Sequence, residues 1–166
     1  MDYRIVEEAH ALPDAEWLRR ISRAYLWVRT QVDMVEAVLD GSPTQEELYS
    51  ITAVSQWFPT VLQSVESIPG PRSVRGQRAQ LHLRKALLRY IAAAQDSSLD
   101  DHPVNSPCAC GNVHTHVRLE MPRAELAALR QACARARGHL QVTANYIAAQ
   151  SQTTPRRKLT AWARAA

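Results

Sequence analysis

The sequence lacks the features that mark membrane, secreted and disulfide-stabilised proteins. Arginine or aspartate interrupts every apolar run among the 166 residues, so none approaches the roughly 18 residues that a membrane span requires. The first ten residues include Glu7 and Glu8 and lack the apolar stretch of a secretory signal. Three cysteines are an odd number, which is not typical of a disulfide framework. We therefore expect a cytoplasmic protein with no membrane partner.

The sequence also lacks the motifs of the common enzyme classes. It contains no glycine-rich phosphate loop, no nucleophile elbow and no Glu-x-x-His pattern of helical metal ligands. A catalytic zinc centre needs a general base beside an open coordination position, and Glu120 is the only carboxylate close to His114 and His116. The sequence therefore predicts that the protein is not an enzyme. A metal-dependent or redox enzyme is the least favoured hypothesis.

Lysine is scarce, and charge is unevenly distributed. The 18 arginines and two lysines, with many alanines, are typical of a GC-rich genome, so we expect a bacterial or phage source. The net charge of +4 combines a net −6 in residues 1–66, from 11 acids and 5 bases, with a net +10 in residues 67–166, from 5 acids and 15 bases. The two parts could neutralise each other, or the basic part could face a polyanion such as nucleic acid.

Four stretches show apolar residues at steps of three and four, the spacing of helices with one buried stripe. They span about residues 13–40, 43–68, 73–94 and 122–154. Such stripes bury best against one another, so we predict an all-α single domain over residues 1–154 that resembles a four-helix bundle. Residues 95–121 form a long loop or a short β-hairpin between the third and fourth long helices. A basic C-terminal tail, residues 155–166, follows.

Local signals add detail to these helices. Ser42 can cap the second helix, with Gln45 reaching back in a capping box. Pro59 removes an amide donor, which predicts a kink or a break near Trp57. Gly138 lowers the stability of the last helix by about 1 kcal/mol relative to alanine, so we expect a neighbouring helix to approach closely there.

The predicted third helix has two unlike faces. At about 100° per residue, apolar residues gather on one side: Leu81, Leu83, Leu87, Leu88, Tyr90 and Ile91. The other side aligns basic residues and one histidine within an arc of about 80°: Arg75, Arg78, His82, Lys85 and Arg89. Arg84 falls on the apolar side, where it needs a carboxylate or several carbonyls unless the helix rolls to expose it.

This basic helix face supports our first functional hypothesis. Aligned cations neutralise several phosphates and give an affinity that falls steeply with salt. Two further groups could extend the surface: Arg130, Arg135 and Arg137 in the last helix, and Arg156, Arg157 and Lys158 in the tail. The sequence therefore predicts a non-catalytic helical module that binds nucleic acid or a nucleic-acid–protein assembly in an accessory or regulatory role. The alternative is a solvated face paired to acids such as Glu36, Asp40, Glu46 or Glu47.

Residues 108–116 concentrate possible metal ligands. Alternating apolar and polar residues from Val113 to Leu119 predict a short strand. A hairpin that turns through residues 111–113 places Cys110 opposite His114 and Cys108 opposite His116. Two thiolates and two imidazoles suit a structural zinc ion, which is the only cofactor that we predict.

The spacing of the two cysteines leaves alternatives to zinc open. C-x-C is shorter than the usual C-x₂₋₄-C, and an extended strand separates two such sulfurs by about 6–7 Å. Cys133 could replace one ligand if its helix packs nearby. An irregular surface loop and a redox-active cysteine pair remain alternative interpretations of the segment.

Residues 44–56, TQEELYSITAVSQ, resemble the opening of a bacterial helix-turn-helix, in which a small residue at Ala53 and the following Val-Ser mark the turn. The resemblance implies that the next helix, residues 59–66, enters the major groove of DNA. This stretch contains no arginine or lysine, and Tyr49 stands where a small residue is usual. An ordinary amphipathic helix is the alternative, and it is favoured.

Large apolar residues outside the predicted stripes support a different function. Leu26 and Trp27 fall off the stripe of the first helix, and Tyr49 and Trp57 off that of the second. If they are exposed together, they form a patch that requires a partner. The alternative hypothesis is therefore a protein–protein interaction or assembly subunit, an adaptor or homo-oligomeric scaffold, with no affinity for nucleic acid.

Overall fold

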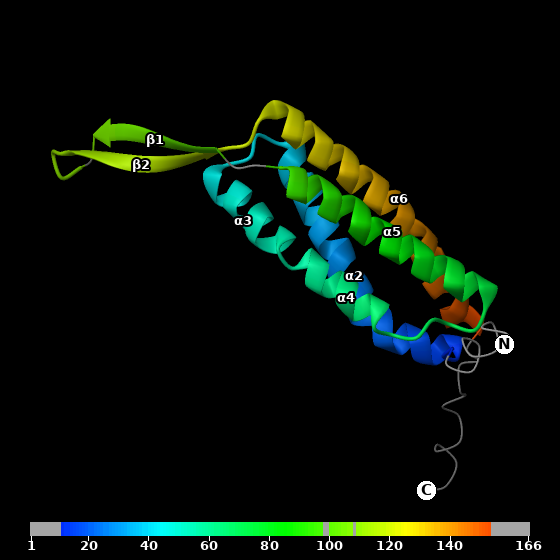
Figure 1. Ribbon diagram of the computed structural model, residues 1–166. Coiled ribbons are helices and arrows are strands. Elements are labelled where there is room, and N and C mark those ends of the chain that lie inside the picture. The colour runs from blue at the N-terminus through cyan, green and yellow to red at the C-terminus, as the bar shows by residue number, and fades with distance from the viewer. Residues whose placement is uncertain (1–10, 98–99, 108, 154–166) are drawn as a thin grey trace, which may run out of the picture.

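The computed structural model describes residues 11–97, 100–107 and 109–153, with the backbone alone for residues 100–106, 114–119 and 153. The fold is all-α and resembles a four-helix bundle, as predicted. Its long helices lie side by side (Figure 1): α2 (Asp14–Asp40), α5 (Val74–Asp96) and α6 (Arg123–Thr153). The shorter helices α3 (Gln45–Ser55) and α4 (Phe58–Glu66) follow one another along the bundle and together take the place of a fourth helix.

A two-stranded antiparallel ribbon joins α5 to α6. Its strands are β1 (Asp100–Pro107) and β2 (Val113–Glu120), and it projects from one end of the bundle (Figure 1). The register runs from Asp100 opposite Glu120 to Pro107 opposite Val113. Gly111 lies in the connecting turn with a φ of 85°, a conformation that glycine adopts without steric cost. Within the described residues, no helix is long and apolar enough to span a bilayer.

α3 begins two residues later than the sequence predicted. Thr44, not Ser42, is the N-cap, and its hydroxyl accepts a hydrogen bond from the Glu47 amide at 3.3 Å. The Glu47 carboxylate accepts one from the Thr44 amide at 2.8 Å, which completes the capping box. The prediction with Gln45 was wrong because the charged oxygen of Glu47 is the stronger acceptor.

The break near Trp57 lies where Pro59 predicted it. Trp57 is the N-cap of α4, and Pro59 occupies its first turn, where a missing amide donor costs nothing. Phe58 is fully buried, stacking on Tyr90 of α5 at 3.9 Å between ring centroids and contacting Trp27 of α2 at 5.0 Å. The N-terminus of a recognition helix must reach DNA bases, so this packing favours the amphipathic-helix interpretation of residues 44–66.

The core follows the predicted stripe of α2 closely but departs from that of α5. The buried residues of α2 are Trp17, Ile21, Tyr25, Val28, Val32, Val35 and Leu39. In α5, small residues replace part of the predicted apolar face: Gly76, Ala79, Leu83, Ala86, Leu87 and Tyr90 are buried. Leu81 and Leu88 are 47% and 44% exposed, so their predicted burial was wrong. The small residues Gly76 and Ala79 lie on the side of α5 that packs against α6.

Close contact between α5 and α6 explains the small residues. The buried hydroxyl of Thr143 in α6 donates to the carbonyl oxygen of Ala79 in α5 at 3.1 Å. A Cβ added to Gly76 would lie 2.8 Å from the Pro71 ring and 2.9 Å from the Tyr146 hydroxyl. Gly138, by contrast, has open space where its Cβ would be. The predicted close approach at Gly138 was therefore wrong, since that residue lies on an exposed side of α6.

Asp14 joins three helices at the other end of the bundle. Its carboxylate, in the first turn of α2, accepts hydrogen bonds from the Ser73 amide at 3.1 Å, from the Ser73 hydroxyl and from the Tyr146 hydroxyl of α6. Ser73 is also the N-cap of α5 and accepts from the Gly76 amide at 2.9 Å. Burial raises the pKa of Asp14, but these hydrogen bonds outweigh it and hold that pKa below its usual value.

Alanine substitutions at the two helical glycines should have opposite effects. Gly138→Ala should stabilise the protein by about 1 kcal/mol because alanine is the better helix former and meets nothing there. Gly76→Ala should destabilise it by about 1–3 kcal/mol, since the clash with Pro71 and Tyr146 exceeds that gain. Thermal and urea unfolding measure both. Stabilisation by Gly76→Ala would contradict the close packing of α5 on α6.

Candidate nucleic-acid interface

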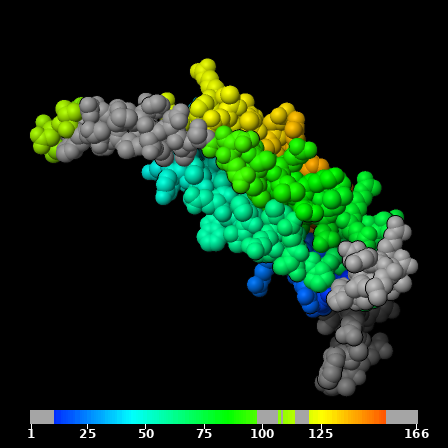
Figure 2. Space-filling view, in the orientation of Figure 1, coloured from blue at the N-terminus to red at the C-terminus, as the bar shows by residue number. Residues whose placement is uncertain are grey.

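The cationic face predicted on α5 is exposed. α5 occupies the middle of the surface shown in Figure 2, between α4 and α6. Four predicted residues of this face are exposed along it: Arg75, Arg78, Lys85 and Arg89. We call these four residues the α5 cationic face. Together with His82 they recur at three- and four-residue steps, on a side of α5 that is turned about 120° from the buried Leu83 and Tyr90.

Among the residues that the structure describes, the α5 cationic face has no carboxylate partner. None of its residues makes an ion pair within the part of the chain that the structure describes. Acids of the N-terminal part pair with other arginines instead. Arg84 meets Glu66 of α4 at 2.6 Å, which supplies the carboxylate that its position required while leaving its side chain 54% exposed. The predicted alternative, a face paired to acids, is therefore not what the described residues show.

Two of the arginines predicted to extend the surface belong to another side of the bundle. Arg130 contacts Asp40 of α2 at 3.5 Å, and Arg137 pairs with Glu36. That prediction was wrong for both, because their positions on α6 face α2. Arg135 is exposed and makes no ion pair among the described residues. It lies one turn before His139, so it can extend the α5 cationic face.

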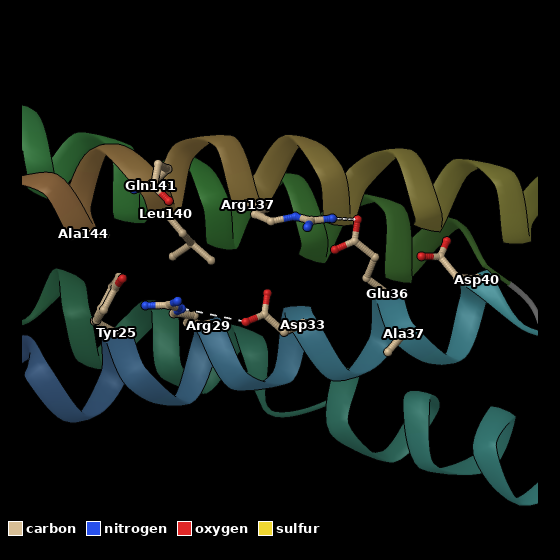
Figure 3. A pocket seen from close by; sticks show the side chains of 10 residues that line it. All are labelled: Tyr25, Arg29, Asp33, Glu36, Ala37, Asp40, Arg137, Leu140, Gln141 and Ala144. Atoms are coloured by element: carbon tan, nitrogen blue, oxygen red, sulfur yellow. Dashed lines mark ion pairs between the residues drawn. The ribbon is translucent and has the colours of Figure 1, made fainter.

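A groove between α2 and α6 shows where the charges of the two parts compensate. It has a volume of about 440 Å³ and is lined by Asp33, Glu36 and Asp40 of α2 and by Arg137 of α6, among other residues (Figure 3). Figure 3 shows Glu36 and Arg137 facing each other across it. Its three carboxylates pair with Arg29, Arg130 and Arg137, so this side offers no excess of positive charge to a polyanion.

His82, the fifth residue predicted for this side of α5, contacts His139 of α6, a partner that the sequence analysis did not predict. Its Nδ1 lies 3.1 Å from Nδ1 of His139 in α6, and the ring centroids are 5.1 Å apart. Both side chains are half-buried. His139 belongs to the series Ala132, Ala136, His139, Thr143, whose steps of four, three and four mark the edge of α6 that packs on α5. That spacing was a usable signal for contact with another helix.

The environment of this histidine pair disfavours protonation. Burial lowers the pKa of His82 first, and the charges of Lys85 and Arg78 lower it further. Burial also lowers the pKa of His139, helped by His82, Lys85 and Arg89. The named charges around the pair are thus all cationic, which is itself evidence that the α5 cationic face is a concentrated positive surface.

The structure changes the predicted arrangement of the cysteine and histidine segment. Ser106 stands opposite His114, and Val104 stands opposite His116, so the predicted pairing of Cys110 and Cys108 with these histidines was wrong. The strands end at Pro107 and Val113, which leaves Cys110 exposed in the turn. Cys108 lies outside the described residues, as do the side chains of His114 and His116. Zinc binding therefore stays a prediction, which elemental analysis of chelator-free protein tests.

Cys133 is not available as a replacement ligand. It is fully buried in the core of the bundle, and burial followed by the charge of Glu36 raises the pKa of its thiol to about 12. A thiol in this state is neutral and inert at physiological pH. Among the described residues, no group of three or more histidine, cysteine or acidic side chains is placed to hold a metal.

The remaining predicted site residues, Arg156, Arg157 and Lys158, lie outside the described residues. Comparisons with protein-family models, with curated proteins and with solved structures found no match to this chain. The candidate site consequently rests on the geometry and charge of α5 and α6 alone.

The lowered pKa values of the histidine pair predict a loss of stability in mild acid. The unfolded chain, with histidine near its ordinary pKa of about 6.5, binds more protons than the folded chain as pH falls. The stability that the neutral histidine pair contributes is therefore present above about pH 6.5 and is lost as the pH falls below it. The melting temperature should therefore fall between about pH 7.5 and 5.5, and fall less in the variant His82→Gln/His139→Gln. An equal fall in both proteins would contradict the assignment.

Proposed function

We propose that the protein is a non-catalytic helical module that binds the phosphate backbone of nucleic acid through the α5 cationic face. The observation that carries the proposal is the exposure of four cations on one helix face without a carboxylate partner among the described residues. Acids that could have neutralised them pair with Arg84, Arg130 and Arg137 instead. Cations left in this state attract a polyanion.

The dimensions of this face suit a nucleic-acid backbone. From Arg75 to Arg89, a helical rise of 1.5 Å per residue gives a length of roughly 21 Å. Duplex DNA carries one charge per about 1.7 Å of axis, so about 12 phosphates lie within that length. Contacts from arginine and lysine to phosphates position a protein on the duplex but carry no sequence information. We therefore propose binding with little sequence specificity.

Fluorescence anisotropy with labelled random duplex and single-stranded DNA tests the proposal. Four phosphate contacts predict that log K falls against log salt with a slope of about −3.6 for duplex DNA. Charge reversal in Arg78→Glu/Arg89→Glu should weaken binding at least tenfold at about 50 mM salt, because two attractive contacts become repulsive.

A matched control separates this face from net charge. Arg23 and Arg123 are exposed on α2 and α6, and Arg23→Glu/Arg123→Glu changes the net charge by the same amount. This variant should bind nearly as well as the wild type. Equal losses in both variants would show that only overall charge matters. No binding by the wild type at about 50 mM salt would reject the function.

Exposed apolar side chains favour a second candidate, a protein-interaction or assembly subunit. Leu26, Tyr49 and Trp57 are 58%, 66% and 62% exposed. Trp27, which the sequence placed with them, is half-buried against Phe58 and does not contribute to such a patch. Light scattering after size-exclusion chromatography tests this candidate: a homo-oligomer that dissociates in Trp57→Ser supports it, and a monomer with no DNA affinity leaves only an external protein partner.

A further inference from the structure

The contact between His82 and His139 constrains where their protons lie. Two Nδ1 atoms 3.1 Å apart form a hydrogen bond only if one carries a proton and the other does not. The neutral rings are therefore in opposite tautomers. The donor ring then has a free Nε2 that can accept a further proton without breaking the contact, and the hydrogen bond becomes charge-assisted. A second added proton would set two donors face to face, so the pair titrates as a unit that accepts one proton.

The cations around the pair lower the pKa at which it accepts that proton. Arg78 and Lys85 act on His82 from α5, and Lys85 and Arg89 act on His139 across the interface. On α6, the exposed Arg135 lies one turn from His139. These cations oppose protonation as long as nothing neutralises them. They equally oppose a divalent metal ion, and no third metal-binding side chain joins the two histidines among the described residues.

We propose that the His82–His139 pair is a proton-linked subsite for a backbone phosphate, at which one proton is taken up as Arg78, Lys85 and Arg89 engage the anion. The inference rests on the proposed function and adds its regulation by pH. A bound phosphate cancels the repulsion from the three cations and offers an acceptor to the charged imidazolium. Proton uptake and phosphate binding therefore strengthen each other.

The sign of the effect follows from linkage. Bound phosphate raises the pKa of the pair above its value in the free protein, so the complex holds more protons than its components in that pH interval. Affinity is highest below the pKa of the free pair, and the gain is lost as pH rises through the pKa of the complex. With one linked proton, the affinity changes by at most about tenfold per pH unit.

The experiment measures duplex affinity by anisotropy at about pH 7.5, 6.5 and 5.5 at constant salt. Wild-type affinity should rise at least about threefold from the highest to the lowest pH. In His82→Gln/His139→Gln this dependence should disappear, whatever the affinity at pH 7.5. The matched control, His10→Gln/His102→Gln, removes two histidines that belong neither to the pair nor to the predicted zinc site, and it should keep the wild-type dependence.

Proton resonances of the histidine rings provide a second measurement on the wild-type protein, independent of whether the variants fold. Adding duplex DNA should move the titration midpoints of His82 and His139 to higher pH. Unchanged midpoints, or the same pH dependence of affinity in wild type and the His82/His139 variant, would overturn the inference while DNA binding stands. Absence of binding at every pH would instead reject the proposed function and the inference with it.

Discussion

The close contact of α5 with α6 orients both the core of the bundle and its charged surface. It requires a glycine at Gly76 and a buried hydrogen bond from Thr143 to the Ala79 carbonyl oxygen. Small side chains at this interface let the two backbones approach, and the rotation of α5 about its axis is then no longer adjustable. The side of α5 that faces solvent is the one carrying Arg78, Lys85 and Arg89. Packing in the core thus determines which charges the surface displays.

The distribution of ion pairs explains why positive charge remains on this surface. The acidic residues of the N-terminal part are not spread evenly over the basic part: Glu36 and Asp40 hold arginines of α6, and Glu66 holds Arg84. Such exposed pairs contribute little stability individually. Their consequence is electrostatic, because among the described residues they pair arginines at the contacts of α2 with α6 and of α4 with α5, and they leave the positive charge of the α5 cationic face concentrated and unpaired. The histidine pair lies within this concentrated charge, where its proton affinity depends on whether an anion is bound.

Local sequence signals were accurate where a residue acts through its own backbone. Pro59 marks the break between α3 and α4, because its missing amide donor is tolerated in the first turn of α4. They were less accurate where two residues compete for one role, as at Thr44 and Ser42, because the sequence does not rank two nearby caps. The ribbon shows the same limit. Alternating apolar and polar residues predicted the strand β2, but the register places Ser106 and Val104 opposite His114 and His116.

Periodicity and charge in the sequence were enough to predict the class of the fold, the positions of its long helices and the cationic stripe of α5, because these are properties of residues close together in the chain. The tertiary structure alone decided which carboxylates neutralise which arginines and that His139 meets His82. The contacts of His139 with His82, of Arg130 with Asp40 and of Arg137 with Glu36 join residues 57 to 101 positions apart, and they depend on how far each helix rotates as its side chains pack. No local pattern specifies that rotation, since Leu81 and Leu88 have the polarity of core residues and yet lie at the surface.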